Sequence, residues 1–147
     1  MKKHLTKTIA TIVFLVVLNI IVQAKGIIPA EIEKVVMDRF PKAQNIEWTE
    51  YSNKEYLASF LLEEQEVMVF IDVNGKFMES NIHLNESHIP KTISDQIFVV
   101  EDAELCYVLE TTSADNVLIY RAKVKVKKDI YEYDFDNSGR MVLKRKM

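Results

Sequence analysis

The feature that most constrains the fold of this chain is an internal similarity at a spacing of 61 to 64 residues. Ile28-Pro29 recurs as Ile89-Pro90, and each pair opens a helix-like stretch. Two alternating segments of the first half also return in the second half, 56–62 as 120–126 and 67–76 as 131–140. Three matched segments in the same order predict two copies of one supersecondary unit.

Each copy is expected to be a helix followed by four strands. Pro29 suits the start of a helix, and Phe40-Pro41 ends it because the residue before a proline is disfavoured in the α region. Asn74-Gly75 and Ser138-Gly139 are hairpin-turn signals between alternating segments. The expected strands of the first copy are 46–51, 55–62, 66–72 and 76–83. The second copy is expected to have a helix over 90–100 and strands over 105–111, 117–127, 130–136 and 140–146.

This order predicts an α+β fold. The two tandem units, 25–83 and 84–147, are expected to form one curved antiparallel sheet in one shared domain, with both helices on one face. Only the short segment 84–88 separates them, and it does not read as a flexible linker.

The N-terminus predicts export. Three lysines precede a long apolar run, and the compact residues Val22-Gln23-Ala24 follow it, which is the layout of a secretory signal peptide over 1–24. The alternative is an uncleaved anchor, but the run is short for a spanning helix and contains Asn19. We therefore expect cleavage before Lys25, a periplasmic or secreted location, and no membrane insertion of the mature chain.

Charge and cysteine content narrow the partners further. Removal of 1–24 takes three of the 19 basic residues and none of the 22 acidic ones, which leaves a net charge of about −6. An acidic domain with scattered lysines gives no electrostatic reason to bind nucleic acid. The single cysteine, Cys106, excludes an intramolecular disulfide and is expected to be a small buried core residue, because its neighbours are apolar.

Cross-strand pairing in the second copy separates the two faces of the expected sheet. If Lys128-Asp129 is a two-residue turn, every residue of 121–126 lies opposite a partner that is either also apolar or of opposite charge. This is the pattern of an antiparallel strand pair with one face in water. The expected charged pairs are Lys125–Glu132, Lys123–Asp134 and Arg121–Asp136, and the expected apolar pairs are Val126–Tyr131, Val124–Tyr133 and Ala122–Phe135. The charged ladder is interpreted as a solvated face whose ion pairs contribute little.

The same register in the first copy, with Glu64-Gln65 as the turn, predicts apolar side chains on the equivalent open face. These are Leu57, Leu61, Met68 and Phe70, with Phe77 expected on the next strand. Exposed apolar patches often mark interaction surfaces, so these five residues are the candidate partner-binding site. Burial beneath the curved sheet and a homodimer interface are the alternatives.

The residues also resemble a known family. Ile28-Pro29, Phe40-Pro41-Lys42-Ala43, Asn45-Ile46-Glu47-Trp48, Tyr56 and Val69–Lys76 resemble the PepSY-like, or beta-lactamase-inhibitor-like, exported bacterial proteins. The second copy keeps Ile89-Pro90 and a closing segment 135–139 but lacks the Phe-Pro-x-Ala and tryptophan signals. The resemblance implies helices on one face of a curved sheet, an open opposite face and no catalytic residue.

No catalytic, cofactor or metal site is expected from the sequence. His83 and His88 lack a third ligand and a rigid frame, and three glycines leave no phosphate-binding loop. Trp48 is expected to pack in the core or at its rim. The predicted function is a non-catalytic exported module that binds a protein or peptide through the open sheet face. The alternatives are an inhibitor or modulator of an exported enzyme and a small ligand-carrying protein.

Overall fold

The computed structural model describes residues 27–50 and 55–147. The expected signal peptide, 1–24, and the expected cleavage point before Lys25 lie outside the described residues. Within the described part, no helix is both long and apolar enough to cross a membrane.

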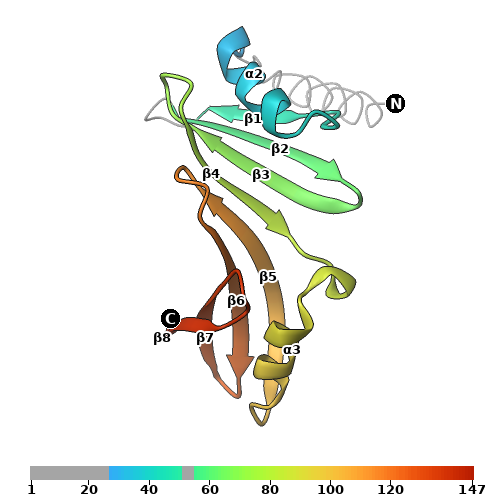
Figure 1. Ribbon diagram of the computed structural model, residues 1–147, viewed down its shortest axis with the longest axis vertical. Coiled ribbons are helices and arrows are strands. Elements are labelled where there is room, and N and C mark those ends of the chain that lie inside the picture. Colours follow the sequence, from blue (N-terminus) through green and yellow to red (C-terminus); the bar gives the residue numbers. More distant parts are fainter. Residues whose placement is uncertain (1–26, 51–54) are drawn as a thin grey trace, which may run out of the picture.

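The described residues contain eight strands, which form a single antiparallel sheet. The spatial order of the strands follows the sequence from β1 to β8 (Figure 1). Two α-helices complete the described fold, so the expected α+β class is confirmed. The first half consists of α2 (Ala30–Arg39), β1 (Glu47–Glu50), β2 (Tyr56–Leu62), β3 (Gln65–Ile71) and β4 (Phe77–His83). After a 3-10 turn, η1 (Glu86–His88), the second half consists of α3 (Lys91–Phe98), β5 (Ala103–Ser113), β6 (Leu118–Val126), β7 (Asp129–Asp136) and β8 (Met141–Lys146).

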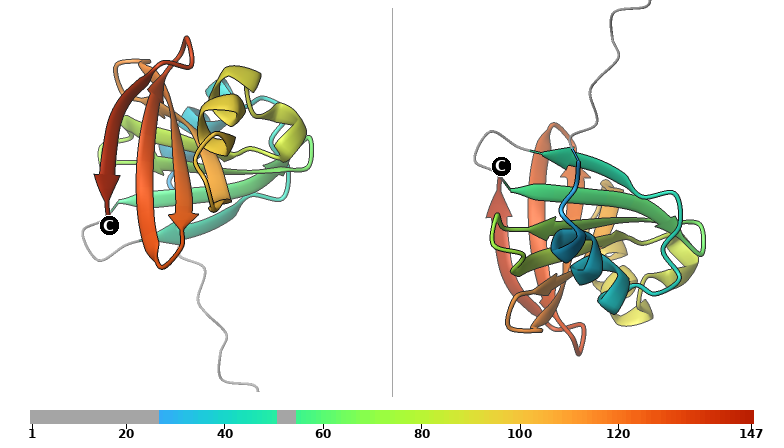
Figure 2. Two further views of the ribbon diagram at one scale, coloured as in Figure 1. Left: turned by 90° about the horizontal axis from the view of Figure 1, so that it is seen from below. Right: turned by 90° about the horizontal axis from the view of Figure 1, so that it is seen from above.

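Both helices pack on the same side of the sheet, each over its own half. Ile32 and Val36 of α2 lie in a core with side chains of β2 and β3, whereas Ile93 and Ile97 of α3 lie in a second core with β5, β6 and β7. Pairing of β4 with β5 joins the halves, and Ile82 of β4 packs against both cores. The sheet bends away from the two helices, so the opposite face is the concave one (Figures 1 and 2).

The two halves have the same type of helix start and the same type of turn in their last hairpin. The carbonyl oxygen of Pro29 accepts the first amide hydrogen bonds of α2, and that of Pro90 does the same for α3. In the β3–β4 hairpin, Asp72 Oδ1 accepts the amides of residues 74 and 76, both at 2.8 Å. In the β7–β8 hairpin, Asp136 Oδ1 accepts the amides of residues 138 and 140, at 2.9 and 3.0 Å. A short aspartate-closed turn therefore fixes the last hairpin of each half.

Gly139 ties α3 to the β7–β8 hairpin. Its φ of 80° lies in the left-handed region, and a Cβ there would overlap the hydroxyl of Thr92. Gln96 of α3 also donates a hydrogen bond from Nε2 to the Gly139 carbonyl, at 2.7 Å. A side chain at this position would strain the backbone and would require Thr92 to move.

The β2–β3 and β6–β7 hairpins, one in each half, differ from the sequence prediction by two residues in register. Leu62 pairs with Gln65 around Glu63-Glu64, and Val126 pairs with Asp129 around Lys127-Lys128. The expected turns, one residue later in each case, were therefore wrong. Positive φ values of 51°, 66° and 56° occur at Glu63, Glu64 and Lys127. Turn positions with positive φ usually hold glycine or asparagine, so no sequence signal marked these turns. A shift of two preserves the faces, because side chains alternate with period two, and changes only the partners.

Cys106 is exposed, contrary to the prediction of a buried core residue. The register of β5 with β6 shifts between Leu105 and Tyr107, and Cys106 is the extra residue at this bulge. A β-bulge leaves one residue outside the ladder, so the alternation that predicted burial does not hold there.

Candidate functional site: the open face of the sheet

Within residues 27–50 and 55–147, no helix lies on the concave face, and the chemical character of this face changes from one half to the other. On β2 and β3 it is largely apolar, whereas on β6 and β7 it is charged. β4 and β5, in the middle, contribute the polar side chains Asn81 and Thr111. The site is therefore described as two neighbouring surfaces on one sheet.

We define the apolar patch as Leu57, Leu61, Met68 and Phe70. Leu57 of β2 lies directly opposite Phe70 of β3, and Met68 lies opposite Ser59 two pairs further along the ladder, on the same face. Leu61, at the hairpin end, is 68% exposed, whereas the other three side chains are half-buried. The structure places all four on the open face, as predicted, in a surface that the curved sheet covers only in part.

Phe77 does not belong to this patch, and its prediction as an open-face residue was wrong. The register of β3 with β4 shifts between Phe70 and Ile71, so that Phe77 pairs with Ile71 on the helix side. There Phe77 is 7% exposed within the first core, and the Arg39 guanidinium of α2 lies 3.5 Å from its ring centroid. The bulge reverses the face that simple alternation would assign.

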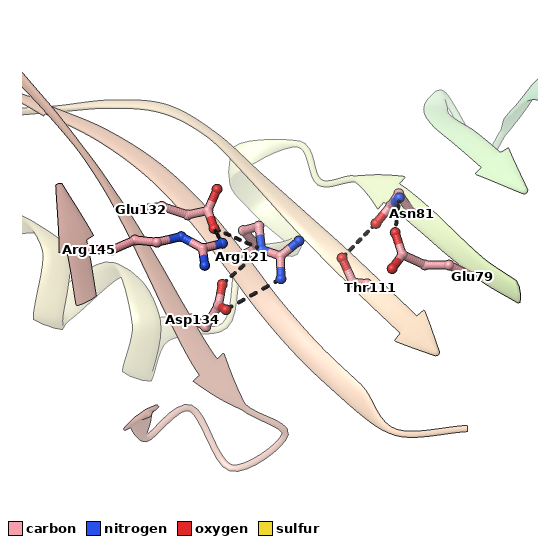
Figure 3. A network of polar contacts seen from close by, with 7 residues as sticks. All are labelled: Glu79, Asn81, Thr111, Arg121, Glu132, Asp134 and Arg145. Carbon is pink, nitrogen blue, oxygen red and sulfur yellow. Dashed lines mark hydrogen bonds and ion pairs between the residues drawn. The ribbon is translucent and has the colours of Figure 1, made fainter. Parts of the chain in front are cut away.

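The charge cluster, which we define as Arg121, Glu132, Asp134 and Arg145, occupies the open face of the second half (Figure 3). Arg121 Nε lies 2.9 Å from Asp134 Oδ1 and 3.3 Å from Glu132 Oε1. A longer contact of 3.4 Å joins the Arg121 Nη2 to Asp134 Oδ2. Arg145 of β8 also pairs with Glu132 through the same carboxylate oxygen. Two arginines thus hold two carboxylates across three adjacent strands.

The acids of this cluster are buried, so the expectation of a solvated charged ladder was wrong here. Glu132 and Asp134 are only 9% and 7% exposed. Glu132 pairs with both Arg121 and Arg145, and Asp134 pairs with Arg121, so the guanidinium groups limit the access of water to the two carboxylates. Hydrogen bonding to Asp134, followed by the attraction of the nearby carboxylates, keeps the pKa of Arg121 above its ordinary value despite partial desolvation. The cluster is internally neutral, because its two arginines balance its two carboxylates.

A chain of side-chain hydrogen bonds, called the polar relay below, lies on β4 and β5 in the middle of the sheet. Thr111 donates to Asn81 Oδ1 at 2.6 Å, and Asn81 Nδ2 donates to Glu79 Oε1 at 2.7 Å. Sequence reasoning missed both this relay and Arg145. The Ser138-Gly139 turn, extended into a β7–β8 register, could have placed Arg145 opposite Glu132. The Thr111–Asn81 contact depends on β4 pairing with β5, and no turn signal sets that register because α3 lies between these strands.

The other residues considered from the sequence lie elsewhere. Trp48 pairs with Ala58 on the helix side and packs against the first core. His83 is exposed and contacts the edge of the Tyr107 ring, with centroids 5.9 Å apart. Within residues 27–50 and 55–147, no cluster of three His, Cys, Asp or Glu side chains could hold a metal ion.

Such a helix-backed sheet with an open concave face defines a class of fold shared with solved bacterial proteins. A BLIP-like protein from Bacteroides fragilis superposes with a TM-score of 0.71 at 16% identity, covering 83% of this chain and 89% of its own. A DUF2874 family protein from Bacteroides uniformis gives 0.69 at 16% identity, covering 81% and 89%. A Bacteroides eggerthii protein whose description assigns it provisionally to the periplasm gives 0.68 at 15% identity, covering 82% and 90%.

These likenesses establish the fold. No protein-family model matches the chain, and no curated protein does either. The BLIP-like description agrees with the beta-lactamase-inhibitor-like part of the family resemblance. The PepSY part of that resemblance has no counterpart among these neighbours.

Proposed function

We propose that this chain is an exported, non-catalytic module that binds a protein or peptide through the apolar patch on its open sheet face. The observation that carries the proposal is the exposure of apolar side chains where the second half carries a self-neutralised charge cluster. At the equivalent pair, Leu57–Phe70 stands where Arg121–Asp134 stands in the second half. The backbone accepts charge at these positions, so the fold itself does not require the apolar set.

The proposed partner is a macromolecule because the patch is part of a broad sheet face bordered by polar groups. Ser59, Glu66 and Glu79 lie directly opposite members of the patch. An apolar centre with a polar rim is the usual anatomy of a protein interface. A second copy of this chain could occupy the same face, and a homodimer is an outcome that the experiment below separates.

A narrower version of the proposal is an inhibitor or modulator of an exported enzyme. The BLIP-like description of the Bacteroides fragilis neighbour supports this version, together with the open concave face. If the captured partner is an enzyme, a fall in its activity in proportion to its occupancy by this chain supports the inhibitor version. Unchanged activity at full occupancy supports a binding role without inhibition.

The proposed compartment is the periplasm or the cell exterior. The lysine-rich start, the apolar run and the Val22-Gln23-Ala24 segment support removal of residues 1–24. N-terminal sequencing of exported protein should begin near Lys25. Full-length chain retained in the membrane would contradict this proposal.

The proposed origin of the fold is duplication of one helix-plus-four-strand unit, 25–83 and 84–147. The Pro29 and Pro90 helix starts and the Asp72 and Asp136 turns support it, since each pair makes the same backbone hydrogen bonds. In this proposal the open-face residues diverged after duplication, and only the first copy kept a binding role.

Site-specific photo-crosslinking tests the binding proposal. A photoreactive residue replaces Leu61 in one protein and Lys125, the equivalent position of the second half, in the matched control. We expect crosslinks to a partner from position 61 only, and we expect Leu57→Arg/Phe70→Asp to abolish them while the protein stays folded. Equal crosslinking from both positions, or crosslinks unaffected by the double change, would contradict a site at the apolar patch. Crosslinks only to the chain itself would assign the patch to a homodimer.

A further inference from the structure

The outer edge of β2 is only partly covered. β2 spans seven residues and β1 only four, and their pairing ends at Glu47 opposite Ser59. Asn45, with a φ of 53°, turns the preceding chain out of strand geometry. Phe60, Leu61 and Leu62 therefore have a neighbouring strand, β3, on one side only.

The backbone of Leu61 is the hydrogen-bonding group at this free edge. The β2–β3 hairpin closes on the pair Leu62–Gln65 around a two-residue turn, so this pair exchanges its hydrogen bonds across the ladder. Alternation then turns the amide and carbonyl of Leu61 away from β3. Among the described residues, no backbone hydrogen bond outside the regular elements involves Leu61.

An open groove of about 710 Å³ lies along this edge. Its lining includes Lys42, Gln44, Glu47, Leu61, Glu63 and Glu66. Lys42 lies 3.7 Å from Glu63, and both side chains are more than 70% exposed. Three carboxylates against one ammonium give the groove a net negative charge, while the exposed Leu61 side chain adds an apolar contact.

We infer that this groove binds an extended peptide that pairs with the free edge of β2 and carries a lysine or arginine two residues from an apolar residue, so that both side chains lie on the face shared by Leu61, Glu47 and Glu66. The inference rests on the proposed binding function and specifies the chemistry of the partner. The Leu61 amide and carbonyl would bond to the peptide backbone, as in strand addition to a sheet edge. An apolar peptide side chain would contact Leu61, and its cation would approach Glu47 and Glu66.

Nuclear magnetic resonance titration of the mature chain tests this site with defined probes. The first probe is the acetylated, amidated peptide Lys-Val-Leu-Val-Lys, whose two lysines share the face of the leucine in an extended strand, and the second replaces both lysines by glutamate. We expect the basic peptide to shift the amide signals of 42–47 and 59–66 and to bind about fivefold more tightly than the acidic one, because two exposed ion pairs contribute about 1 kcal/mol together. Equal affinity of the two peptides, or shifts centred elsewhere, would overturn the inference.

Two variants locate the interaction. Glu47→Gln/Glu66→Gln should remove most of the preference for the basic peptide, whereas Glu104→Gln, on β5 and outside the groove, should leave it unchanged. A basic peptide with proline in place of leucine lacks the central amide and should lose the shift at Leu61. If it binds as well as the parent peptide, strand addition is excluded.

Failure of peptide binding in the groove can be distinguished from failure of partner binding at the apolar patch. Leu57→Arg/Phe70→Asp removes the apolar patch but leaves the groove, so peptide binding should persist in this variant. Loss of partner crosslinking with persistent peptide binding supports both proposals. Concentration-dependent shifts of the same amides in peptide-free protein would assign the groove to a second copy and overturn the peptide inference.

Discussion

The two halves of the open face solve one packing problem in different ways. In the first half, Leu57 lies opposite Phe70, and both side chains are half-buried. In the second half, Arg121 lies opposite Asp134, and the carboxylate is 7% exposed. Two cross-strand pairs that lie 64 residues apart in the sequence therefore hold an apolar pair in one half and a bidentate ion pair in the other.

This difference shows that availability for binding does not follow from polarity alone. The charged half is satisfied internally, because Arg121 and Arg145 neutralise Glu132 and Asp134. The apolar half has no such internal partner, and Leu61 remains 68% exposed. A buried ion pair gives little net stability compared with apolar packing, so the charge cluster is better understood as a way of closing this part of the face.

The largest expected effect separates the helix side of β6 and β7 from their open side. Phe135 is fully buried in the second core, whereas Lys123 lies on the open face near the Tyr107 ring. Phe135→Ala should lower the free energy of unfolding by about 3–5 kcal/mol. Lys123→Ala should cost about 1 kcal/mol or less. Chemical denaturation of both variants measures the difference, and similar losses would contradict the face assignment.

A second comparison lies within the open face of one strand. Arg121 pairs with the buried Asp134, whereas Lys125 pairs with the exposed Glu104 at 3.1 Å. Arg121→Ala should cost about 2 kcal/mol, because it leaves Asp134 buried without its main partner. Lys125→Ala should cost no more than about 1 kcal/mol. Equal and small losses in urea denaturation would mean that water reaches Asp134 freely.

Replacing the Leu57–Phe70 pair by an arginine–aspartate pair tests whether the first half can hold the ion pair found in the second half. Phe70→Asp alone should destabilise the chain by about 2 kcal/mol, because it introduces a half-buried charge opposite Leu57. Addition of Leu57→Arg recreates the pair found at Arg121–Asp134 and should recover about 1 kcal/mol. A double-mutant cycle measured by thermal unfolding gives this coupling energy. A coupling near zero would show that the two backbone environments are not equivalent.

The smallest effect concerns the last hairpin of the second half. Hydrogen bonding from the Ser138 hydroxyl, then from the Arg140 amide, lowers the pKa of Asp136 from 3.8 to about 2. Its contribution to stability is therefore complete above about pH 4 and is lost as the pH falls towards 2. Ser138→Ala should move the pKa of Asp136 upward, as measured by a carbon-detected titration of its carboxyl group. An unchanged pKa would mean that the backbone amides alone hold the carboxylate.

The sequence by itself determined the local structure of this protein. Period-two alternation, the Pro29 and Pro90 helix starts and the Asp72 and Asp136 turns fixed the element order and the faces of most strands. These signals are local, because each depends on residues a few positions apart. For this reason the four residues of the apolar patch could be assigned to the open face before the strand register was known.

Only the tertiary structure decided what depends on bulges, turn conformation and the packing of neighbouring side chains. The β3–β4 bulge moved Phe77 into the first core, and the β5 bulge exposed Cys106. Turns with positive φ at charged residues gave the β2–β3 and β6–β7 hairpins a register two residues away from the predicted one. The packing of Arg121 and Arg145 against Glu132 and Asp134 buried two acids that alternation had assigned to a solvated face. Alternation tells which face a side chain occupies, whereas burial depends on the side chains that pack against it.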